Sequence, residues 1–502
     1  MMYSGNMPSR EPISIQEPPP AISRRRAASI IACITCITSI GNLLAGLLTV
    51  CVPVIAKELN IGLALQLWPV SIFALTCGFT LLPSGAAADV LGCRRTYLLG
   101  SLLQAATTLG SGLARTSSQL LTLRALAGVS ASFCLPSAVA VVTNTFPAGP
   151  RRNLAFAAMG GGQAVGFGLG LTLGGVFSGT IGWRWGFHTA TCLNIVVLLL
   201  ALWTLPSNID KSLGKSTMAS LRDDVDWIGE LILTASLGLL SYEFAVMTSL
   251  GIRKPINISL LTIGLVLLPI FGLWMHRQSR RGRPALIPNN LWTNIPFTTV
   301  CITVFLVWGA LNASEQLTAL YLEDVLGVSP LTSGLYFLPA PVCGALMNVA
   351  IGLMLPYLRP SLAIPIACLT SSIAPVLLAA LCRVNGPSYW GAVFEAMALN
   401  PLSADVIYTV ANLIVTDAFP EKTQALAGGV FNMIAQIGKS VGITTTAIIA
   451  ARISAQAGEG PKEALLLGYK AGWWYNSAIG LATVPLTLWG LKRVGKLGIK
   501  RE

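Results

Sequence analysis

The chain has 502 residues and a net charge of +13, yet only 11% of its residues are charged and 54% are hydrophobic. A soluble domain usually carries about 25% charged residues, so this chain has too few charges to cover a water-facing surface. Its Lys and Arg residues stand in short runs between long apolar segments and do not follow one amphipathic face. We therefore expect an integral membrane protein surrounded by the lipid bilayer, with no nucleic-acid partner.

Apolar segments of membrane-spanning length recur along the chain and predict a polytopic all-α protein. A hydrocarbon core of roughly 30 Å needs about 20 helical residues, and the backbone groups of a spanning segment must pair within the helix. Residues 1–28 are polar and Pro-rich and are predicted to form a disordered cytosolic tail. In chain order we predict spans at 29–55, 63–83, 97–114, 119–143, 154–178, 186–204, 227–248, 257–275, 295–320, 329–357, 362–382, 388–416, 424–453 and 467–491.

These predicted spans divide into six, two and six, giving fourteen in total. The predicted units are an N-terminal six-helix bundle at 29–204, a linker with two extra spans at 205–294, a C-terminal six-helix bundle at 295–492 and a basic cytosolic tail at 493–502. Cytoplasmic loops carry an excess of Lys and Arg. With both termini in the cytosol, 22 of the 33 basic residues are cytosolic, 9 are external, and Arg124 and Lys439 lie within spans. An odd number of spans before the loop that contains Arg277 would place that loop outside the cell and remove the excess of basic residues on the cytosolic side.

A glycine-bounded turn with one acidic and two basic residues follows the second predicted span. It contains Gly85, Asp89, Gly92, Arg94 and Arg95. This pattern resembles the loop signature of the major facilitator superfamily, whose acidic and basic groups tie neighbouring helices together in one gating state. Val90 stands where that family usually has an Arg. The resemblance implies the major facilitator fold and a gating loop; the alternative is a basic cytoplasmic loop with an incidental Asp.

Arg124 lies several residues inside the fourth predicted span, in the segment Leu123-Arg124-Ala125. A membrane-centre Arg costs at least ~2.5 kcal/mol unless it faces protein or water. The segment looks like the fourth-helix motif of the same superfamily, whose Arg is associated with proton coupling, although Ala127 replaces the usual Gln. A purely structural Arg is the alternative.

The fifth predicted span carries Gly166, Gly170 and Gly174 four residues apart, followed by Gly175. Residues at this spacing share one helix face. The spacing is similar to the antiporter motif of drug/proton exchangers, with Leu171 where that motif has a Pro. Together with Trp183-Arg184-Trp185 before the sixth span, it resembles the fungal drug/proton antiporters with fourteen spans, in particular their aminotriazole-resistance-like branch. Tight packing against another helix is the alternative reading of the glycines.

Five further ionisable residues lie in predicted spans and are candidates for proton and substrate sites, because charges within a membrane are costly and usually functional. They are Glu243, Glu315, Glu395, Asp405 and Lys439. Asp405 is the first candidate for the proton carrier and Glu395 the second, with Arg124 and Lys439 completing the proposed coupling set. An Asp405–Lys439 salt bridge that only docks helices is the alternative. Glu315 and Glu243 are expected near the outer ends of their spans, within reach of water.

The sequence indicates that the energy source is a proton gradient and that no cofactor or metal is bound. The two Gly-Lys-Ser triplets lack the first Gly of a nucleotide-binding loop, with Ile209 and Met433 in its place. A proton crossing 100 mV releases ~2.3 kcal/mol, and each pH unit adds ~1.4 kcal/mol. The two His residues, His188 and His276, are far apart in the sequence, and the absence of a GxSxG elbow also argues against an enzyme.

The predicted function is therefore proton-coupled export of amphipathic toxic compounds or secondary metabolites by a monomer in the plasma or vacuolar membrane. A selective carrier of the same fold is the alternative, for a siderophore, a sugar or a small inorganic acid such as borate. A membrane-embedded enzyme or sensor is the third reading. Exporters with many substrates bind them in apolar sites whose residues do not identify one ligand. The sequence therefore does not specify the substrate.

Overall fold

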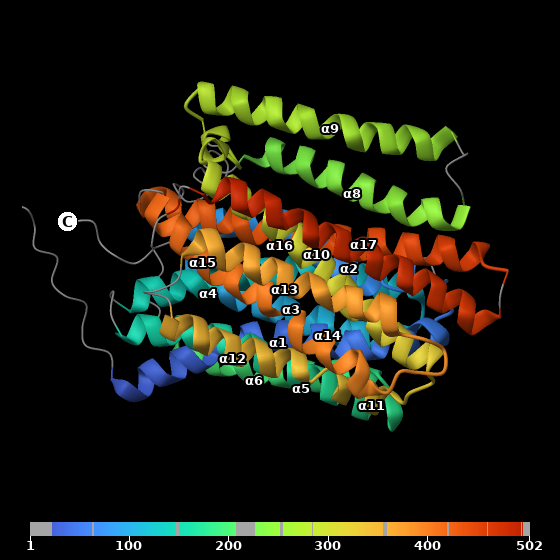
Figure 1. The fold of residues 1–502 in the computed structure, drawn as a ribbon. Helices are drawn as coiled ribbons and strands as arrows, with labels where there is room; N and C mark the ends of the chain where they lie inside the picture. The colour runs from blue at the N-terminus through green and yellow to red at the C-terminus, as the bar shows by residue number, and fades with distance from the viewer. Residues whose placement is uncertain are drawn as a thin grey trace, which may run out of the picture.

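The structure is a computed structural model that describes residues 23–62, 65–146, 150–206, 226–250, 255–283, 285–354, 359–418, 421–458, 460–492 and 494. Within these ranges every regular element is a helix, and the only strand-like feature is one bridge between Arg383 and Gly386. The long helices lie side by side in one elongated bundle (Figure 1). The predicted all-α fold is confirmed.

Six helices occupy the predicted N-terminal bundle: α1 (Arg24–Glu58), α2 (Trp68–Leu91), α3 (Cys93–Leu113), α4 (Ser117–Thr145), α5 (Pro150–Gly179) and α6 (Arg184–Thr204). α1 packs against α5 and α6, α2 against α4, and α3 against α4 and α6. α1 begins inside the predicted tail because the Ser23 hydroxyl accepts a hydrogen bond from the Arg26 amide (3.3 Å) and caps the helix. Residues 1–22 of that tail, and all of the predicted C-terminal tail except residue 494, lie outside the described residues.

The two extra helices, α8 (Trp227–Leu250) and α9 (Pro255–Arg280), form a hairpin at the edge of the bundle (Figure 1). α8 packs on α2 and α16, whereas α9 packs mainly on α8. Asp226 fastens the hairpin at one end, since its carboxylate accepts hydrogen bonds from the Gly229 amide (2.9 Å) and from Trp274 Nε1 (3.0 Å). The outer face of α9 is open, with Leu273 70% exposed.

The second half contains six long helical units, two of which are interrupted. Its elements are η3 (Asn289–Thr293), α10 (Ile295–Leu320), the π-helical turn η4 (Tyr321–Val325), α11 (Pro330–Tyr336), α12 (Pro339–Met354), α13 (Pro360–Leu381), η5 (Tyr389–Gly391), α14 (Val393–Leu399), α15 (Leu402–Ala418), α16 (Glu421–Gln456) and α17 (Pro461–Gly490). The first break lies at residues 337–338, directly before Pro339, and the second includes Pro401; proline supplies no amide hydrogen to continue a helix.

Helices occupy all of the predicted span ranges, and the described residues contain ten helical segments that are long and apolar enough to cross a membrane. The predicted spans outside these ten coincide with α3, α8, α14 with α15, and α17, of which α8 is apolar over Trp227–Leu240. α3 begins with two arginines and α17 carries Lys462, Glu463 and Lys470. The structure therefore supports a membrane protein with several spans, while the count of fourteen stays a prediction.

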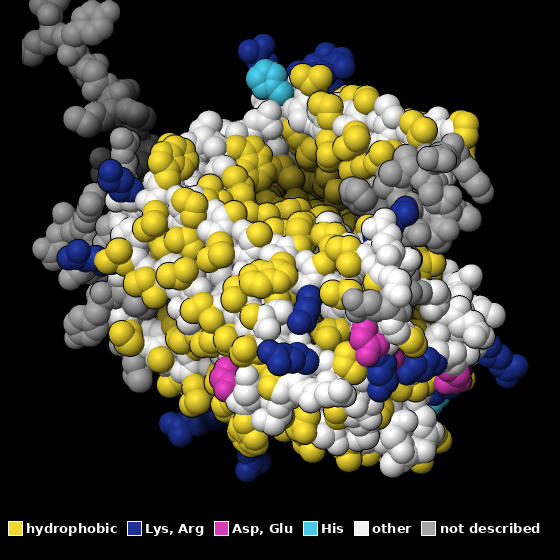
Figure 2. All heavy atoms as spheres, turned by 45° about the vertical axis from the view of Figure 1, so that its right-hand side comes forward, with side chains coloured by type: hydrophobic (Ala, Val, Ile, Leu, Met, Phe, Trp, Pro, Cys, Tyr) yellow, Lys and Arg dark blue, Asp and Glu magenta, His cyan; other side chains and the backbone are white. Residues whose placement is uncertain are grey.

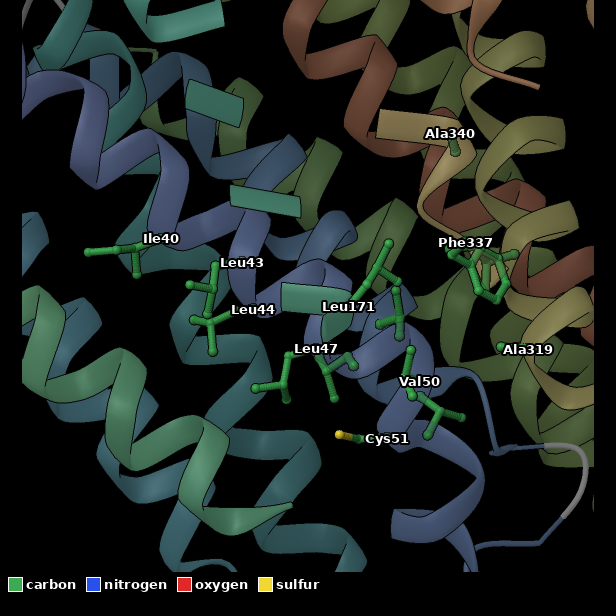
Figure 3. Close-up of a cluster of buried hydrophobic side chains, with 14 of the residues drawn as sticks. Ile40, Leu43, Leu44, Leu47, Val50, Cys51, Leu171, Ala319, Phe337 and Ala340 are labelled. Atoms are coloured by element: carbon green, nitrogen blue, oxygen red, sulfur yellow. The ribbon is translucent and has the colours of Figure 1, made fainter. Parts of the chain in front are cut away.

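The largest buried apolar cluster contains residues from both halves (Figure 3). Leu47 of α1 and Leu171 of α5 lie in it together with Ala319 of α10 and with Phe337, which is fully buried. The outside of the molecule is apolar as well: Figure 2 shows hydrophobic side chains over most of the visible face, with charged side chains in small groups. Large exposed side chains such as Trp203 (91%) belong to this outer surface, which suits contact with lipid.

Candidate functional site

The predicted gating loop joins α2 to α3 through Gly92, whose φ of 101° favours glycine. Arg94 donates from Nε to the Leu205 carbonyl (3.0 Å) and from Nη2 to the Leu202 carbonyl (3.3 Å), so it binds the carboxyl end of α6. Arg95 donates to the Leu91 carbonyl (3.4 Å). Gly85 lies in α2 facing Pro136 of α4. The Asp89 side chain lies outside the described residues, and the gating role of the loop stays a prediction.

Arg124 lies in α4 with its side chain turned into the protein. It is 2% exposed, donates from Nε to the Pro69 carbonyl (3.1 Å), and places its guanidinium 4.5 Å from the centre of the Phe73 ring. Both partners belong to α2. Arg124 therefore faces protein, where a carbonyl and an aromatic face replace part of its hydration.

Lys439 of α16 is half-buried and lies within electrostatic reach of Arg124 in α4, Glu315 in α10 and the Cys77 thiol in α2. Glu315 is 6% exposed, and its carboxylate accepts a hydrogen bond from Asn400 Nδ2 (3.4 Å). Arg124 and Glu315 therefore form a loose cluster around Lys439, and Glu315 makes no ion pair with Lys439 among the described residues. α4 belongs to the first half of the chain, and α10 and α16 to the second.

Asp405 lies apart from this cluster, in the first turn of α15 facing α12. Its Oδ1 accepts a hydrogen bond from Asn348 Nδ2 (3.0 Å), whereas the buried Oδ2 has no hydrogen-bond partner among the described residues. Oδ2 points toward Gly344, and a Cβ atom added to Gly344 would lie 3.1 Å from this oxygen. No salt bridge joins Asp405 to Lys439 among the described residues, and the acid within electrostatic reach of Lys439 is Glu315.

The remaining candidate acids differ from their expected exposure. Glu395 is exposed in the first turn of α14, so the second candidate for the proton carrier is not sheltered within the bundle. Glu243 and Glu315 were expected to reach water and are instead 0% and 6% exposed. Both carboxylate oxygens of Glu243 lack a hydrogen-bond partner in the described part of the chain. For Glu315 the reason is that the helical path continues past residue 320 through η4, which places this residue deeper than the predicted span end.

The glycines of the fifth helix form two contact faces. Gly166, Gly170 and Gly174 pack against the α1 backbone, where a Cβ on Gly174 would lie 2.9 Å from the Leu47 carbonyl oxygen and the other two would approach Ser39 and Leu43 still more closely. Gly175 faces the second half of the chain, where a Cβ added to Gly175 would lie 2.6 Å from the Leu331 Cα. Three of the four glycines therefore allow tight packing of α5 on α1, as the alternative interpretation predicted. The antiporter role of these glycines stays a prediction.

The second half repeats this arrangement, since Gly438 and Gly442 of α16 pack against the α10 backbone. A Cβ on Gly438 would lie 2.7 Å from the Phe305 Cα, and Gly442 meets Gly309. In each half the fifth long helix thus packs on the first through glycines. This symmetry is a feature of transporters that hold their substrate between related units.

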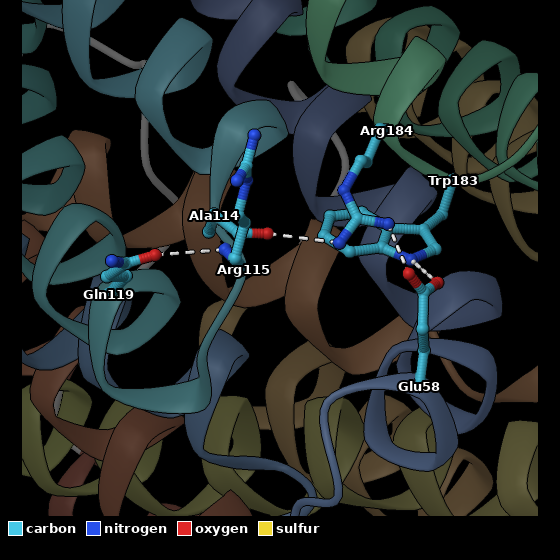
Figure 4. Close-up of polar contacts among 6 residues, drawn as sticks. All are labelled: Glu58, Ala114, Arg115, Gln119, Trp183 and Arg184. Carbon is cyan, nitrogen blue, oxygen red and sulfur yellow. Dashed lines mark hydrogen bonds and ion pairs between the residues drawn. The ribbon is translucent and has the colours of Figure 1, made fainter.

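One end of the bundle carries two polar connections, and Figure 4 shows the first of them, around Glu58. Within the first half, Glu58 accepts a hydrogen bond from Trp183 Nε1 (2.6 Å) and pairs with Arg184, which also donates to the Ala114 carbonyl (3.1 Å). Between the halves, Lys57 of α1 pairs with Asp324 of η4 (2.8 Å). Sequence reasoning missed the Lys57–Asp324 pair because loop charges 267 positions apart give no pairwise signal.

Within the described residues no group of three or more His, Cys, Asp or Glu side chains could hold a metal ion. The polar features of the site are instead single carboxylates and cations on different helices, placed where the two halves meet or just inside the second half. Such groups can bind a proton or an ion, and their positions on separate helices link binding to helix movement.

Comparison with known proteins identifies the fold. The family model described as Major Facilitator Superfamily matches residues 31–443. The structure of a bacterial homolog of the human lysosomal transporter Spinster, in an inward-facing and unoccupied conformation, matches with a TM-score of 0.65 and 14% identity, covering 94% of this chain and 98% of that one.

Curated relatives are transporters with several named activities. The chain is 36% identical to MFS-type transporter 1 of Pyricularia oryzae, over 95% of this chain and 85% of that protein. It is 26% identical to the low affinity ammonium transporter of Saccharomyces cerevisiae (84% and 80% covered) and 22% identical to the aminotriazole resistance protein of the same yeast (85% and 76%). Other relatives are named an efflux pump, 24% identical over 96% of this chain, and a multidrug transporter, 26% identical over 83%.

Proposed function

Because the chain belongs to the Major Facilitator Superfamily, we propose that it is a proton-coupled secondary transporter that exports amphipathic toxic compounds or secondary metabolites. Its relatives include an aminotriazole resistance protein, an efflux pump and a multidrug transporter. The members of this family move small molecules across membranes and are not enzymes.

The proposal rests on the surroundings of the Asp405 carboxylate. Its Oδ1 has a neutral partner, Asn348, and its Oδ2 has none among the described residues. A carboxylate in a membrane-embedded bundle is stable only when it binds a proton or lies beside a cation. A proton and a cationic group of a substrate would therefore compete for Asp405, and such competition lets proton entry drive substrate exit.

The proposed arrangement in the membrane follows from the charge distribution. We propose fourteen spans, with both termini and the Arg277–Arg283 loop in the cytosol of a cell that carries the protein in its plasma or vacuolar membrane. In this orientation the end joined by Lys57 and Asp324 faces away from the cytosol. The protein would act as a monomer without a cofactor.

The direct test is efflux of a fluorescent amphipathic cation, such as ethidium, from yeast cells that express the chain or an empty vector. Cells with the wild-type chain should retain less dye, and a protonophore should abolish the difference. Asp405→Asn should retain as much dye as the vector while reaching the membrane, whereas Glu395→Gln, an exposed acid in the same half, should behave as wild type. Unchanged dye retention across a broad panel of compounds would contradict the proposal.

A selective carrier is the second candidate, supported by the relative named as a low affinity ammonium transporter. It predicts a response to one small solute, such as ammonium, borate, a sugar or a siderophore, and uptake instead of export. Growth of the same yeast strains on limiting or toxic concentrations of these solutes separates the two candidates.

A further inference from the structure

The helical path of the second half is interrupted between α14, which ends at Leu399, and α15, which begins at Leu402. Pro401 explains part of this break, because it has no amide hydrogen to donate to the carbonyl four residues earlier. The Leu399 carbonyl and the Ser403 amide are also four residues apart, and in a continuous α-helix they would pair directly. In this protein both groups bind a side chain of a neighbouring helix instead.

That side chain is Ser371 of α13, a helix that packs against both α14 and α15. The Ser371 hydroxyl donates to the Leu399 carbonyl (3.0 Å) and accepts from the Ser403 amide (2.8 Å). Ser371 is buried, and a buried backbone group without a partner is costly. A hydroxyl inserted into the hydrogen-bond ladder of a helix bends or breaks it. Ser371 therefore holds the break open while it satisfies both backbone groups.

A small polar cavity lies beside the break. It has a volume of about 20 Å³, and its polar lining includes Ser314, Ser371, Asn400, Ser403 and Asn476. A polar cavity of this volume holds about one water molecule. One side of the break is therefore not filled by side chains, and the first turn of α15 has space to shift there.

The break lies one turn from the Asp405 carboxylate and faces the same residue of α12. The Pro401 carbonyl accepts the hydrogen bond of the Asp405 amide (3.2 Å). A Cβ atom added to Gly344 would lie 3.1 Å from Asp405 Oδ2 and 3.8 Å from Pro401 Cβ. Asn348, one turn further along α12, donates to Asp405 Oδ1 (3.0 Å). The position of α15 at the break therefore sets whether the carboxylate reaches Asn348.

We propose that Ser371 is a positioning residue for Asp405: its hydroxyl holds the break between α14 and α15 and thereby keeps the Asp405 carboxylate on Asn348. Without this hydroxyl, Leu399 and Ser403 lose their fixed partner, and the first turn of α15 shifts toward the cavity. The use of this placement in transport rests on the proposed role of Asp405, whereas the effect on the break requires neither substrate nor transport.

Hydrogen exchange of the purified, substrate-free protein tests the effect on the break. In Ser371→Ala the backbone amides of segment 399–406 should exchange about tenfold faster than in wild type, because the Ser403 amide loses its fixed acceptor. Ser371→Thr keeps the hydroxyl and should exchange as wild type, whereas Ser371→Val has the shape of Thr without the hydroxyl and should exchange as Ser371→Ala. The matched control is Ser372→Ala, which lines the same cavity but whose hydroxyl donates to the Cys368 carbonyl of its own helix (2.6 Å).

The reactivity of the Asp405 carboxyl group tests the effect on its position. Dicyclohexylcarbodiimide is an apolar reagent that modifies carboxyl groups, and peptide mass spectrometry at one fixed pH gives the rate at Asp405 relative to the exposed Glu395. Ser371→Ala should raise this ratio about tenfold, because a carboxyl group released from Asn348 is more open to the reagent. Asn348→Ala should raise it as well, and the double variant should add little, since both changes act through the same contact. A general loss of structure would raise both rates and leave the ratio unchanged.

Wild-type exchange in Ser371→Ala, or faster exchange with a wild-type ratio at Asp405, would overturn the inference. If Ser371→Ala does not fold, Ser371→Cys keeps a group of similar size that hydrogen-bonds more weakly, and it should raise both the exchange and the ratio about threefold. Wild-type values in that variant would overturn the inference too. Absence of dye efflux from wild-type cells, with exchange and labelling as expected, would instead contradict only the proposed function.

Discussion

At the scale of single residues, the interior is organised by how each costly charge is compensated. Arg124 has a carbonyl and an aromatic ring, and Lys439 lies within electrostatic reach of Glu315. Asp405 has one neutral amide and an oxygen without a partner. Charges that are satisfied by fixed partners hold helices in place, whereas an acid with a vacant oxygen is free to bind a mobile cation or a proton. From this contrast we propose that Arg124 positions helices and that Asp405 exchanges a proton or a cation.

Arg124→Ala should lower the maximal export rate roughly tenfold with little change in the substrate concentration for half-maximal rate. It removes the bond to Pro69 and the contact with Phe73 that hold α4 against α2, and buried polar contacts of this kind contribute about 1–2 kcal/mol. Arg124→Lys should restore part of the rate because it keeps the charge. Arg115→Ala, an exposed cation before the same helix, is the matched control. Wild-type rates for Arg124→Ala at equal surface amounts would contradict this assignment.

At the scale of elements, the glycine faces decide which helices approach most closely. α5 packs on α1 and α16 packs on α10 with backbone against backbone, so a single methyl group has no space at these positions. The same glycines read from sequence alone are compatible with an antiporter motif or with tight packing against another helix. The contact partner decides between these, and it is set by tertiary structure.

Gly170→Ala should destabilise the protein by about 1–3 kcal/mol, the usual cost of adding a methyl group to a filled contact. A Cβ there would overlap the Leu43 backbone. The control is Gly161→Ala in the same helix, where the added Cβ meets nothing within 4 Å and helix propensity favours Ala by about 1 kcal/mol. Thermal unfolding of the two purified variants in detergent measures the difference. Equal melting temperatures for both would show that α1 and α5 are less closely packed than described.

The Lys57–Asp324 pair should bias the halves toward contact at the end where α1 terminates. Because the Lys57 side chain is 70% exposed, the pair contributes about 0.2–1 kcal/mol, and Asp324→Lys should change the export rate by roughly twofold to fivefold. Exchanging both residues, Lys57→Asp with Asp324→Lys, should recover the wild-type rate, which a double-mutant cycle would quantify. A double exchange as impaired as the single variants would mean that the pair has no role in joining the halves.

At the scale of the whole molecule, the sequence predicted the architecture better than the site. Long apolar segments and loop charges place helices in all the predicted ranges, since lipid leaves the backbone no alternative to helix. The depth of the interior acids was harder to predict from the sequence. The predicted end of a span is uncertain by a few residues, and a shift of that size moves Glu315 from the water layer into the bundle. Which interior charges come near one another depends on helix rotation, which apolar periodicity does not specify in a helix that is apolar on most sides.

Topology can be tested by labelling introduced cysteines from one side of the membrane. In a chain whose exposed Cys36 and Cys192 are changed to Ser, Gln278→Cys should react with a membrane-impermeant maleimide only after the cells are permeabilised. Glu463→Cys, exposed at the start of α17, should react in intact cells. Reaction of Gln278→Cys in intact cells would place the Arg277–Arg283 loop outside and overturn the proposed orientation.

The central claim is that a proton gradient drives substrate movement through Asp405. Purified wild-type protein in proteoliposomes, with ethidium on one side and an imposed pH gradient, measures this directly. Dye should move against the direction of proton flow, at a rate that rises with the gradient and reverses when the gradient is reversed, while Asp405→Asn proteoliposomes should show only the leak of empty liposomes. Dye movement that is the same with and without the gradient, or the same in wild type and Asp405→Asn, would contradict the account.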